Sequence, residues 1–377
     1  MVNNTILACN KWSNQQILDI HQQMLQLTLG IICKSVLNYE IEAESHKVSK
    51  LMTTFHSSHT NILDIFLLEL LHSCKQLLHR VGRSGSKKSD KESATTGNFS
   101  IRTQNSIARV LGKLAPVDKL ADSRDAKMQL DSIVYRLIVD RRKDEKRLHH
   151  SYDKDLLSKL IQAQDAGKMS DLQVRDELMT IFVAGHETTA NSLAWTFYLL
   201  SQNTNVQEKL HKEIDAVLDN GNAIPSIEYI PRLEYTESIF REALRLFPPI
   251  WSIRRYVRTD FTLSGYIIPA GSTILMSPYV MHHDPHYYEE PERFNPDRWT
   301  DEFKKRLPRF SYFPFGGGKR SCIGESFSWM EAVLVIAVIA QKWEMQSVPN
   351  QNVKLDPGST LRPKYGIRMR INLRKRN

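Results

Sequence analysis

Apolar residues recur at helical spacing along most of this chain and alternate with polar residues only in short stretches. The spacing predicts helices over residues 14–36, 60–80, 122–147, 204–219 and 233–247. The longest predicted helix starts after residues 170–173 (Ser-Asp-Leu-Gln), which have the spacing of a capping box, and runs to about Ser201. Short strands are predicted between Arg255 and Ser277, and the alternating tail from Tyr365 predicts one more. The chain is therefore predicted to be mainly α with a minor antiparallel β region.

The composition is that of a globular protein and argues against several functional classes. The chain has 377 residues, of which 41% are hydrophobic, enough to bury a large core. The formal charge of +9 is spread in small clusters, and no basic stripe with interleaved aromatic residues indicates nucleic-acid binding. No apolar run reaches about 18 residues, so no transmembrane segment is predicted. The 4 cysteines form no Cys-x-x-Cys pair, which fits a reducing compartment, and we expect a cytoplasmic protein.

One cysteine near the end of the chain stands in a glycine-rich loop before a long apolar stretch. Residues 315–324 read Phe-Gly-Gly-Gly-Lys-Arg-Ser-Cys-Ile-Gly, and residues 327–343 predict a helix after them. A thiolate at a helix N-terminus is stabilised by the helix dipole and by unpaired backbone N–H groups. Glycines on both sides of Cys322 allow a flat macrocycle to approach the backbone. The arrangement suits a thiolate ligand to haem iron. The alternative is a buried cysteine that packs as a small hydrophobic residue.

The pattern Phe-x-x-Gly-x-Arg-x-Cys-x-Gly in this loop resembles the haem-binding loop of the cytochrome P-450 family. It is filled by Phe315, Gly318, Arg320, Cys322 and Gly324. The resemblance implies that these residues bind haem b (iron protoporphyrin IX) and that Cys322 is the axial ligand of its iron.

A second motif, Ala-Gly-His-Glu-Thr-Thr at residues 184–189, lies inside the longest predicted helix. Glycine and threonine oppose helix propensity, so a local requirement is expected to outweigh that loss. The stretch resembles the oxygen-activation motif of the same family. On that reading Ala184 and Gly185 lie at the cofactor, and Gly185 gives room for dioxygen. Glu187 and Thr188 are then the catalytic residues that supply protons. The alternative is a packing notch against another helix, in which threonine bonds back to the i−4 carbonyl.

Glu242 and Arg245 are three residues apart and share one face of a predicted helix. They resemble the Glu-x-x-Arg pair of the family, whose third partner is an arginine in a Pro-x-Arg-Phe element. Residues 291–294 match that element, so Arg293 is the predicted third member. A buried carboxylate needs paired, bidentate donors to stay charged. The implied role is to hold the loop that carries Cys322, whereas an exposed pair would contribute little.

The resemblance also places two residues at the edge of the haem, whose propionates need cations or hydrogen-bond donors. Arg255 matches the family's second cation beside Arg320, and His282 resembles a further contact. The alternatives are an ordinary surface cation and an ordinary loop histidine.

The resemblance is continuous from about residue 153 to the end, and residues 14–36 also match it. It implies a single cytochrome P-450 domain over residues 1–377 that lacks about 100 residues at the N-terminal side of the family's fold. The polar segment 82–98 cannot bury enough apolar surface to order itself, so a disordered surface loop is predicted there.

The implied function is that of a haem-thiolate monooxygenase, which inserts one oxygen atom from dioxygen into an apolar organic substrate. The chain contains no flavin or iron–sulfur motif, so the electrons are expected to come from an external reductase or ferredoxin. Two alternatives stay open. A haem-dependent enzyme that rearranges peroxides would not need Glu187 and Thr188. A truncated haem-binding relic without turnover would fit the absence of the family's N-terminal part.

Overall fold

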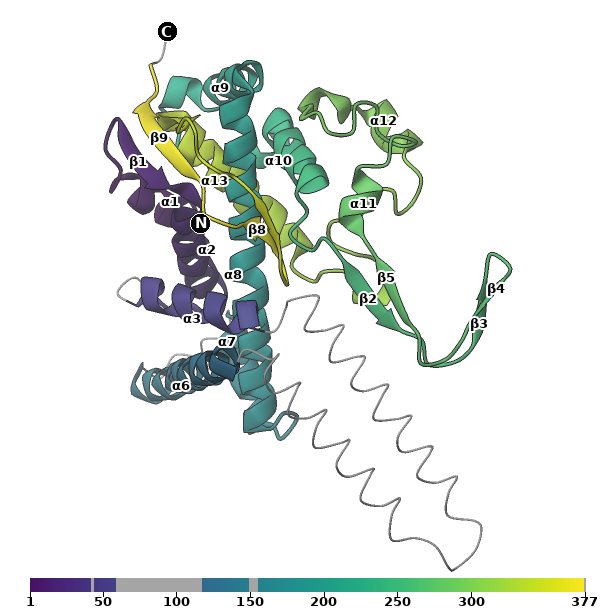
Figure 1. Ribbon diagram of the computed structural model, residues 1–377. Coiled ribbons are helices and arrows are strands. Elements are labelled where there is room, and N and C mark those ends of the chain that lie inside the picture. Colours follow the sequence, from purple (N-terminus) through teal and green to yellow (C-terminus); the bar gives the residue numbers. More distant parts are fainter. Residues whose placement is uncertain (42–43, 59–116, 149–154, 376–377) are drawn as a thin grey trace, which may run out of the picture. The chain divides into compact units, whose positions relative to one another are not determined.

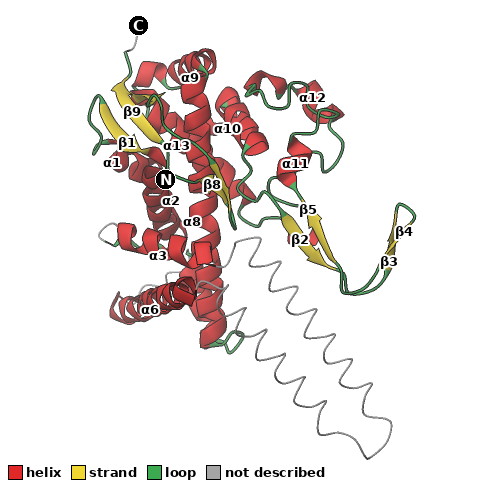
Figure 2. Cartoon of the chain, in the orientation of Figure 1, coloured by secondary structure: helices red, strands yellow, loops and turns green. Residues whose placement is uncertain are grey.

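The computed structural model describes residues 1–41, 44–58, 117–148 and 155–375. Helices dominate these residues, and the strands are confined to small antiparallel sheets (Figure 2). The predicted mainly α class with minor antiparallel β structure is therefore confirmed.

The chain divides into two compact units. The first is Met1–Ser49 with Ile138–Asn377, and the second is Lys50–Leu137. All the site residues predicted from the sequence belong to the first unit. The helix predicted over 60–80 and the loop predicted over 82–98 lie outside the described residues, and the single domain expected over 1–377 stays a prediction.

Eleven α-helices occur in the described part of the chain, and Figure 1 labels each of them. They are α1 (Val2–Cys9), α2 (Ile20–Leu37), α3 (Ser45–Ser58), α6 (Val117–Leu148), α7 (Leu156–Asp165), α8 (Asp171–Gln202), α9 (Thr204–Val217), α10 (Glu234–Leu246), α11 (Pro278–His282), α12 (Asp301–Arg306) and α13 (Glu325–Lys342). Among these described helices, none combines the length and apolar character that a bilayer crossing requires.

Helix α8 begins with the predicted capping box. The Ser170 side chain accepts a hydrogen bond from the backbone N–H of Gln173, and the Gln173 side chain accepts one from the backbone of Ser170. Helix α2 packs along α8 (Figure 1). Large side chains such as Trp195 are fully buried in the α8 half that follows the 184–189 motif.

The largest sheet joins the two ends of the described chain. Strand β9 (Arg368–Leu373) lies in the middle, with β1 (Gln16–Asp19) on one side and β6 (Trp343–Ser347) on the other. Gln16 stands opposite Ile371, so residues 16–19 are a strand, and the helix predicted over 14–36 begins only at Ile20. This pairing with a distant strand overrides the local helical pattern. The alternating tail that predicted a strand is confirmed.

The remaining strands form three two-stranded sheets. They are β2 (Ile253–Tyr256) with β5 (Thr273–Met276), β3 (Phe261–Leu263) with β4 (Tyr266–Ile268), and β7 (Leu355–Pro357) with β8 (Leu361–Pro363). Helix α13 has ten consecutive buried residues, 331–340. A helix that is apolar on all sides belongs in a core, so α13 ties the loop before it to the centre of the first unit.

Candidate functional site

Cys322 is presented on an exposed loop immediately before α13. The loop closes through a hydrogen bond of 2.9 Å from the Cys322 N–H to the Phe315 carbonyl oxygen. Gly316 and Gly318 have φ of +73° and +68°, a region that side chains with a Cβ rarely occupy. Gly324 is the N-cap residue of α13, so the thiol stands at the positive end of the helix dipole.

The other described cysteines differ from Cys322. Cys9 and Cys33 are buried, and burial raises the pKa of each thiol to about 12. The Cys322 thiol is free and exposed. Cys74 lies outside the described residues. Among the described cysteines, Cys322 alone is accessible to a ligand.

The residues around the Cys322 sulfur fit a flat, iron-containing cofactor. A Cβ at position 324 would lie 3.8 Å from the Cys322 Sγ, in contact with it, so glycine leaves that side of the sulfur open. A Cβ at Gly318 would meet no atom within 4 Å, and Ile323 is fully exposed. One accessible thiol with open space beside it is the donor set that a haem-thiolate site needs. The alternative of a buried cysteine does not describe Cys322.

Aromatic packing holds the base of this loop. The ring of Phe315 lies 6.0 Å from that of Trp329 in α13, centroid to centroid. A Cβ at Gly317 would lie 2.4 Å from the Cε1 of Phe310, so the glycine lets that ring lie against the loop. The pattern match had singled out Phe315 but not Gly317, whose role depends on this contact with the preceding segment.

The 184–189 motif divides between two faces of α8. The Thr188 hydroxyl donates to the Ala184 carbonyl oxygen at 2.7 Å. Residues four apart share a helix face, and here Ala184 is exposed and Thr188 half-buried. Glu187 is instead buried, and its Oε1 accepts a hydrogen bond of 2.6 Å from the Thr360 hydroxyl. The structure therefore places the two predicted catalytic residues on different sides of the helix.

Gly185 faces another helix. A Cβ at this position would lie 2.8 Å from the Cδ1 of Ile32 in α2, which is closer than real Cβ atoms approach. Gly185 thus permits the close packing of α2 on α8, so the expectation that it makes room for dioxygen is replaced by the packing notch. Ala184, one residue earlier, lies on the accessible face with Thr188.

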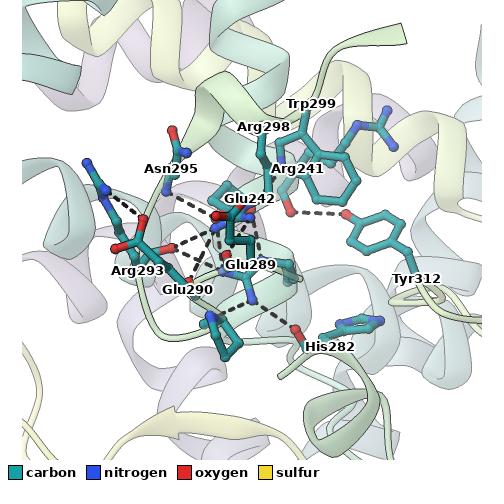
Figure 3. A network of polar contacts seen from close by, with 12 residues as sticks. Arg241, Glu242, His282, Glu289, Glu290, Arg293, Asn295, Arg298, Trp299 and Tyr312 are labelled. Carbon is teal, nitrogen blue, oxygen red and sulfur yellow. Dashed lines mark hydrogen bonds and ion pairs between the residues drawn. The ribbon is translucent and has the colours of Figure 1, made fainter. Parts of the chain in front are cut away.

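A buried ion-pair network surrounds Glu242 (Figure 3). Glu242 and Arg245 are both 0% exposed, and Arg245 donates to both carboxylate oxygens at 2.9 Å. Arg298 adds a third hydrogen bond through its Nε at 2.9 Å. The indole N–H of Trp299 and the backbone N–H of Asn295 complete the shell. The paired, bidentate donors predicted for this carboxylate are present.

The third member of this network is Arg298, so the prediction of Arg293 is corrected. The Arg293 side chain is 61% exposed and pairs with Glu290, whereas that of Arg298 is 6% exposed and pairs with Glu242 (Figure 3). Arg293 contributes only its backbone carbonyl, which accepts from Arg245. The sequence carries the Pro-x-Arg-aromatic spacing twice, at 291–294 and at 296–299. The second copy is the one that reaches the buried carboxylate.

His282 connects this network to the chain that leads into the cysteine loop. Arg245 donates to the His282 carbonyl oxygen at 2.8 Å, and the His282 Nε2 accepts from the backbone N–H of Phe313 at 2.9 Å. The imidazole also stacks on Tyr312. Burial, with a smaller contribution from the Arg245 charge, lowers the pKa of His282 to about 3. The ring is therefore neutral and can act as an acceptor.

Protein atoms enclose His282 completely, so it has no surface with which to touch a haem. The predicted haem-edge contact is replaced by an anchor for residues 312 and 313. Tyr288 adds a second anchor through its hydroxyl, which donates to the Ser311 carbonyl oxygen at 3.0 Å. These anchors connect the Glu242 network with residues 311–313, which lead into the loop of Cys322, and so support the implied role of the network in holding that loop.

The two predicted propionate partners are both exposed. Arg320 closes the short 3-10 turn Gly318–Arg320, two residues before the cysteine. Arg255 lies on β2, and its Nη1 donates to the carbonyl oxygen of Arg254. Both guanidinium groups are accessible to an anion, and their role at a propionate stays a prediction.

The chain is similar to known proteins over nearly its whole length. The model of the cytochrome P-450 family matches residues 5–370. A crystal structure of a mutant cytochrome P-450 haem domain superposes with a TM-score of 0.74 at 23% identity, covering 99% of this chain and 72% of that one. At this identity the likeness shows the fold, which is the predicted one.

Relatives at higher identity match about two thirds of the chain. Cyclooctatin synthase of Streptomyces melanosporofaciens is 42% identical over 66% of this chain and 54% of that protein. Cyclooctat-9-en-7-ol 5-monooxygenase of the same organism is 37% identical over 64% of this chain and 53% of that protein. Pentalenene oxygenase of Streptomyces avermitilis is 34% identical over 65% and 54%. The chain spans about half the length of the curated relatives it matches.

Proposed function

Since this chain belongs to the cytochrome P-450 family, we propose that it is a haem-thiolate monooxygenase. It inserts one oxygen atom from dioxygen into an apolar organic substrate, and an external reductase or ferredoxin supplies the electrons. The observation that carries the proposal is the exposed Cys322 thiol on a glycine loop at the N-terminus of α13. Haem b bound at that thiol would supply the activation of dioxygen.

The residues of the chain have separate tasks in this reaction. Cys322 would bind the haem iron, and the hydrogen bond from its backbone N–H to the Phe315 carbonyl oxygen holds the part of the loop that carries this side chain. Thr188 lies on the accessible face of α8, where its hydroxyl donates a hydrogen bond to the Ala184 carbonyl oxygen. The hydroxyl oxygen can at the same time accept a hydrogen bond from water. Glu187 is next to Thr188 in sequence but lies on the buried side of α8, and its carboxyl group is the proton donor that we propose for the site. Arg255 and Arg320 would supply positive charge for the propionates.

The relatives' names support a narrower substrate class. Two of them name cyclooctat-9-en-7-ol and pentalenene, which by their names are alkenes made mostly of hydrocarbon. We therefore propose an alkene-containing, mostly apolar substrate for this chain. Carotene epsilon-monooxygenase of Arabidopsis thaliana, 35% identical over 213 residues, names another alkene.

The first test is the absorption spectrum of the haem-loaded, reduced and carbon-monoxide-bound protein. The wild type should show the thiolate-type Soret band of the family, and Cys322→Ala should lose it. Cys9→Ala is the matched control, because Cys9 is a buried cysteine away from the loop, and it should keep the band. A Cys322→Ala protein that retained the band would refute this ligand.

Isotope labelling separates the monooxygenase from the two alternatives. With a competent reductase and a substrate that is turned over, the product should carry one atom from ¹⁸O-labelled dioxygen and none from labelled water. Turnover of an organic peroxide without oxygen uptake would favour the rearrangement enzyme. Tight haem binding with no turnover under either condition would favour the haem-binding relic.

A further inference from the structure

A continuous chain of buried hydrogen bonds runs from Glu187 to the start of α2. The Thr360 hydroxyl donates to the Glu187 Oε1 at 2.6 Å. The Asn191 Nδ2 donates to the Thr360 Oγ1 at 3.1 Å, and the Asn191 Oδ1 lies 2.7 Å from the His21 Nε2. All four side chains are buried. Buried polar groups that are linked in this way orient one another.

The donors of this chain all point toward the carboxyl group. The amide of Asn191 gives its N–H to Thr360, so its oxygen is left to accept from the His21 Nε2–H. This places a proton on the His21 Nε2. Burial lowers the pKa of His21, against the raising effects of the Asn191 hydrogen bond and of the Asp19 and Glu187 charges, and Arg362 lowers it further. The neutral form agrees with the geometry.

Each link is fixed by contacts of its own. The residue after Thr360, Leu361, donates its backbone N–H to the Pro249 carbonyl oxygen, and its own carbonyl accepts from the indole of Trp195 in α8. At the other end, Asp19 caps α2 by accepting from the backbone N–H of His21 at 3.0 Å. The chain is therefore held at both ends by the backbone and does not depend on its members alone.

We propose that Thr360, with Asn191 and His21 behind it, is the positioning device for Glu187 in the proposed oxygenation. The hydroxyl holds the carboxyl group on the inner side of α8, and the amide and imidazole hold the hydroxyl. The carboxamide of Asn191 does not act as an acid or a base near neutral pH, so the chain orients Glu187 and does not conduct protons through its length. This inference rests on the proposed function only where it concerns turnover.

The hydrogen bond itself can be read without any activity. The infrared difference between the full-length wild type and Glu187→Gln isolates the carboxyl bands of Glu187. Thr360→Val should shift these bands, because it keeps the side-chain shape and removes the donor, and Thr360→Ser should leave them in place. Thr196→Val is the matched control, since Thr196 is a buried α8 threonine whose hydroxyl donates to Ser192. It should not move the bands.

The outer links are tested in the same spectra. Asn191→Leu and His21→Phe should each shift the Glu187 bands by less than Thr360→Val does. Neither should add a shift in a Thr360→Val background, because they act through that hydroxyl. The proposal would be overturned if Thr360→Val did not shift the Glu187 bands. It would also be overturned if Asn191→Leu shifted them equally in the wild type and in the Thr360→Val variant. Thr360→Ala serves as a second donor-free variant where Thr360→Val does not fold.

Turnover supplies an independent readout. Thr360→Val should lower the ratio of product to reductant consumed severalfold and release the difference as hydrogen peroxide, whereas Thr360→Ser should restore the ratio. In a Glu187→Gln background Thr360→Val should have no further effect, and an undiminished effect there would contradict a role through Glu187. A wild type without turnover would refute the proposed function, while the infrared bands would still decide the positioning.

Discussion

Two buried glutamates in this protein are held in opposite ways. Glu242 accepts hydrogen bonds from two guanidinium groups, an indole and a backbone amide, whereas Glu187 accepts from a hydroxyl backed by an amide and an imidazole. Fixed positive charges keep a carboxylate ionised and immobile. The Thr360 hydroxyl orients the Glu187 carboxyl group without itself carrying a charge. The first arrangement suits a scaffold, and the second suits the proton transfer that we propose for Glu187.

A third buried carboxyl group marks the limit of this comparison. Burial raises the pKa of Glu331 in α13 well above its ordinary value, and within the described residues neither of its oxygens has a hydrogen-bond partner. A buried carboxyl group without donors becomes neutral. The hydrogen-bond donors around Glu242 and Glu187 therefore give each of these carboxyl groups a fixed orientation, which Glu331 lacks.

The largest effect is expected where a fixed charge is removed. Arg298→Ala leaves the Glu242 carboxylate with one guanidinium fewer in a site without solvent, and should cost about 3–5 kcal/mol of unfolding free energy. Arg293→Ala is the matched control and should cost about 0.5 kcal/mol or less, because its side chain is exposed. Urea unfolding of both variants gives the comparison. Equal costs would refute the assignment of Arg298 to the network.

A smaller effect is expected where α2 meets α8, beside the Glu187 chain. Gly185→Ala places a methyl group against Ile32, and overpacking of this kind costs about 1–3 kcal/mol, partly offset by about 1 kcal/mol of helix propensity. Ile32→Val removes the methyl group that would clash, so the double variant should recover most of the loss. Urea unfolding should show that recovery. If Gly185→Ala changes the unfolding free energy equally in the wild-type and Ile32→Val backgrounds, the packing role fails.

His282, beside the Glu242 network, should make the unfolding free energy of the protein depend on pH. Its folded pKa of about 3 lies below its ordinary value of 6.5, so the unfolded chain takes up the proton first as the pH falls. The stability that His282 contributes is complete above about pH 6.5 and is lost toward pH 3 at about 1.4 kcal/mol per pH unit.

Replacing His282 should remove that dependence. His282→Gln can still accept from Phe313 but cannot titrate, so its unfolding free energy should fall less steeply between pH 6.5 and 5 than that of the wild type. The exposed His286 is the control, and His286→Gln should keep the wild-type slope. An unchanged slope in His282→Gln would mean that this imidazole is protonated in the folded protein.

A smaller stability effect than that of Arg298→Ala is expected in the chain of Thr360, Asn191 and His21. Thr360→Val removes two hydrogen bonds, one to Glu187 and one from Asn191, and should cost about 1–2 kcal/mol, measured by urea unfolding beside Arg298→Ala. A loss as large as that of Arg298→Ala would mean that Glu187 is held as rigidly as Glu242, and the contrast between the two glutamates would disappear.

Local patterns in the sequence predicted the features that depend on neighbouring residues. The capping box at 170–173 and the glycine loop before Cys322 are of this kind, since the relevant atoms lie within a few positions of one another. The pairing of Glu242 with Arg245 is also local, because i and i+3 share a helix face.

The features that the sequence left open depend on residues brought together by the fold. The pattern Pro-x-Arg-aromatic occurs twice, and only the tertiary structure shows that Arg298 and not Arg293 reaches the carboxylate. Thr360 lies 173 positions from Glu187, and no spacing rule links them. Gly185 lies in a motif that resembles an active-site sequence, but in the fold it packs against another helix.

The sheet of β1, β9 and β6 has a consequence for how the protein is made. Its middle strand, β9, follows both of its partners in the chain. Neither partner can therefore pair until residues 368–373 have left the ribosome. Asp19, which caps the helix of His21, also accepts a hydrogen bond from Ile367, just before β9. Asp19 therefore gains this second partner only when the segment before the last strand has been made. Until then β1 and β6 are unpaired edges, and a chaperone would find its substrate in this interval of synthesis.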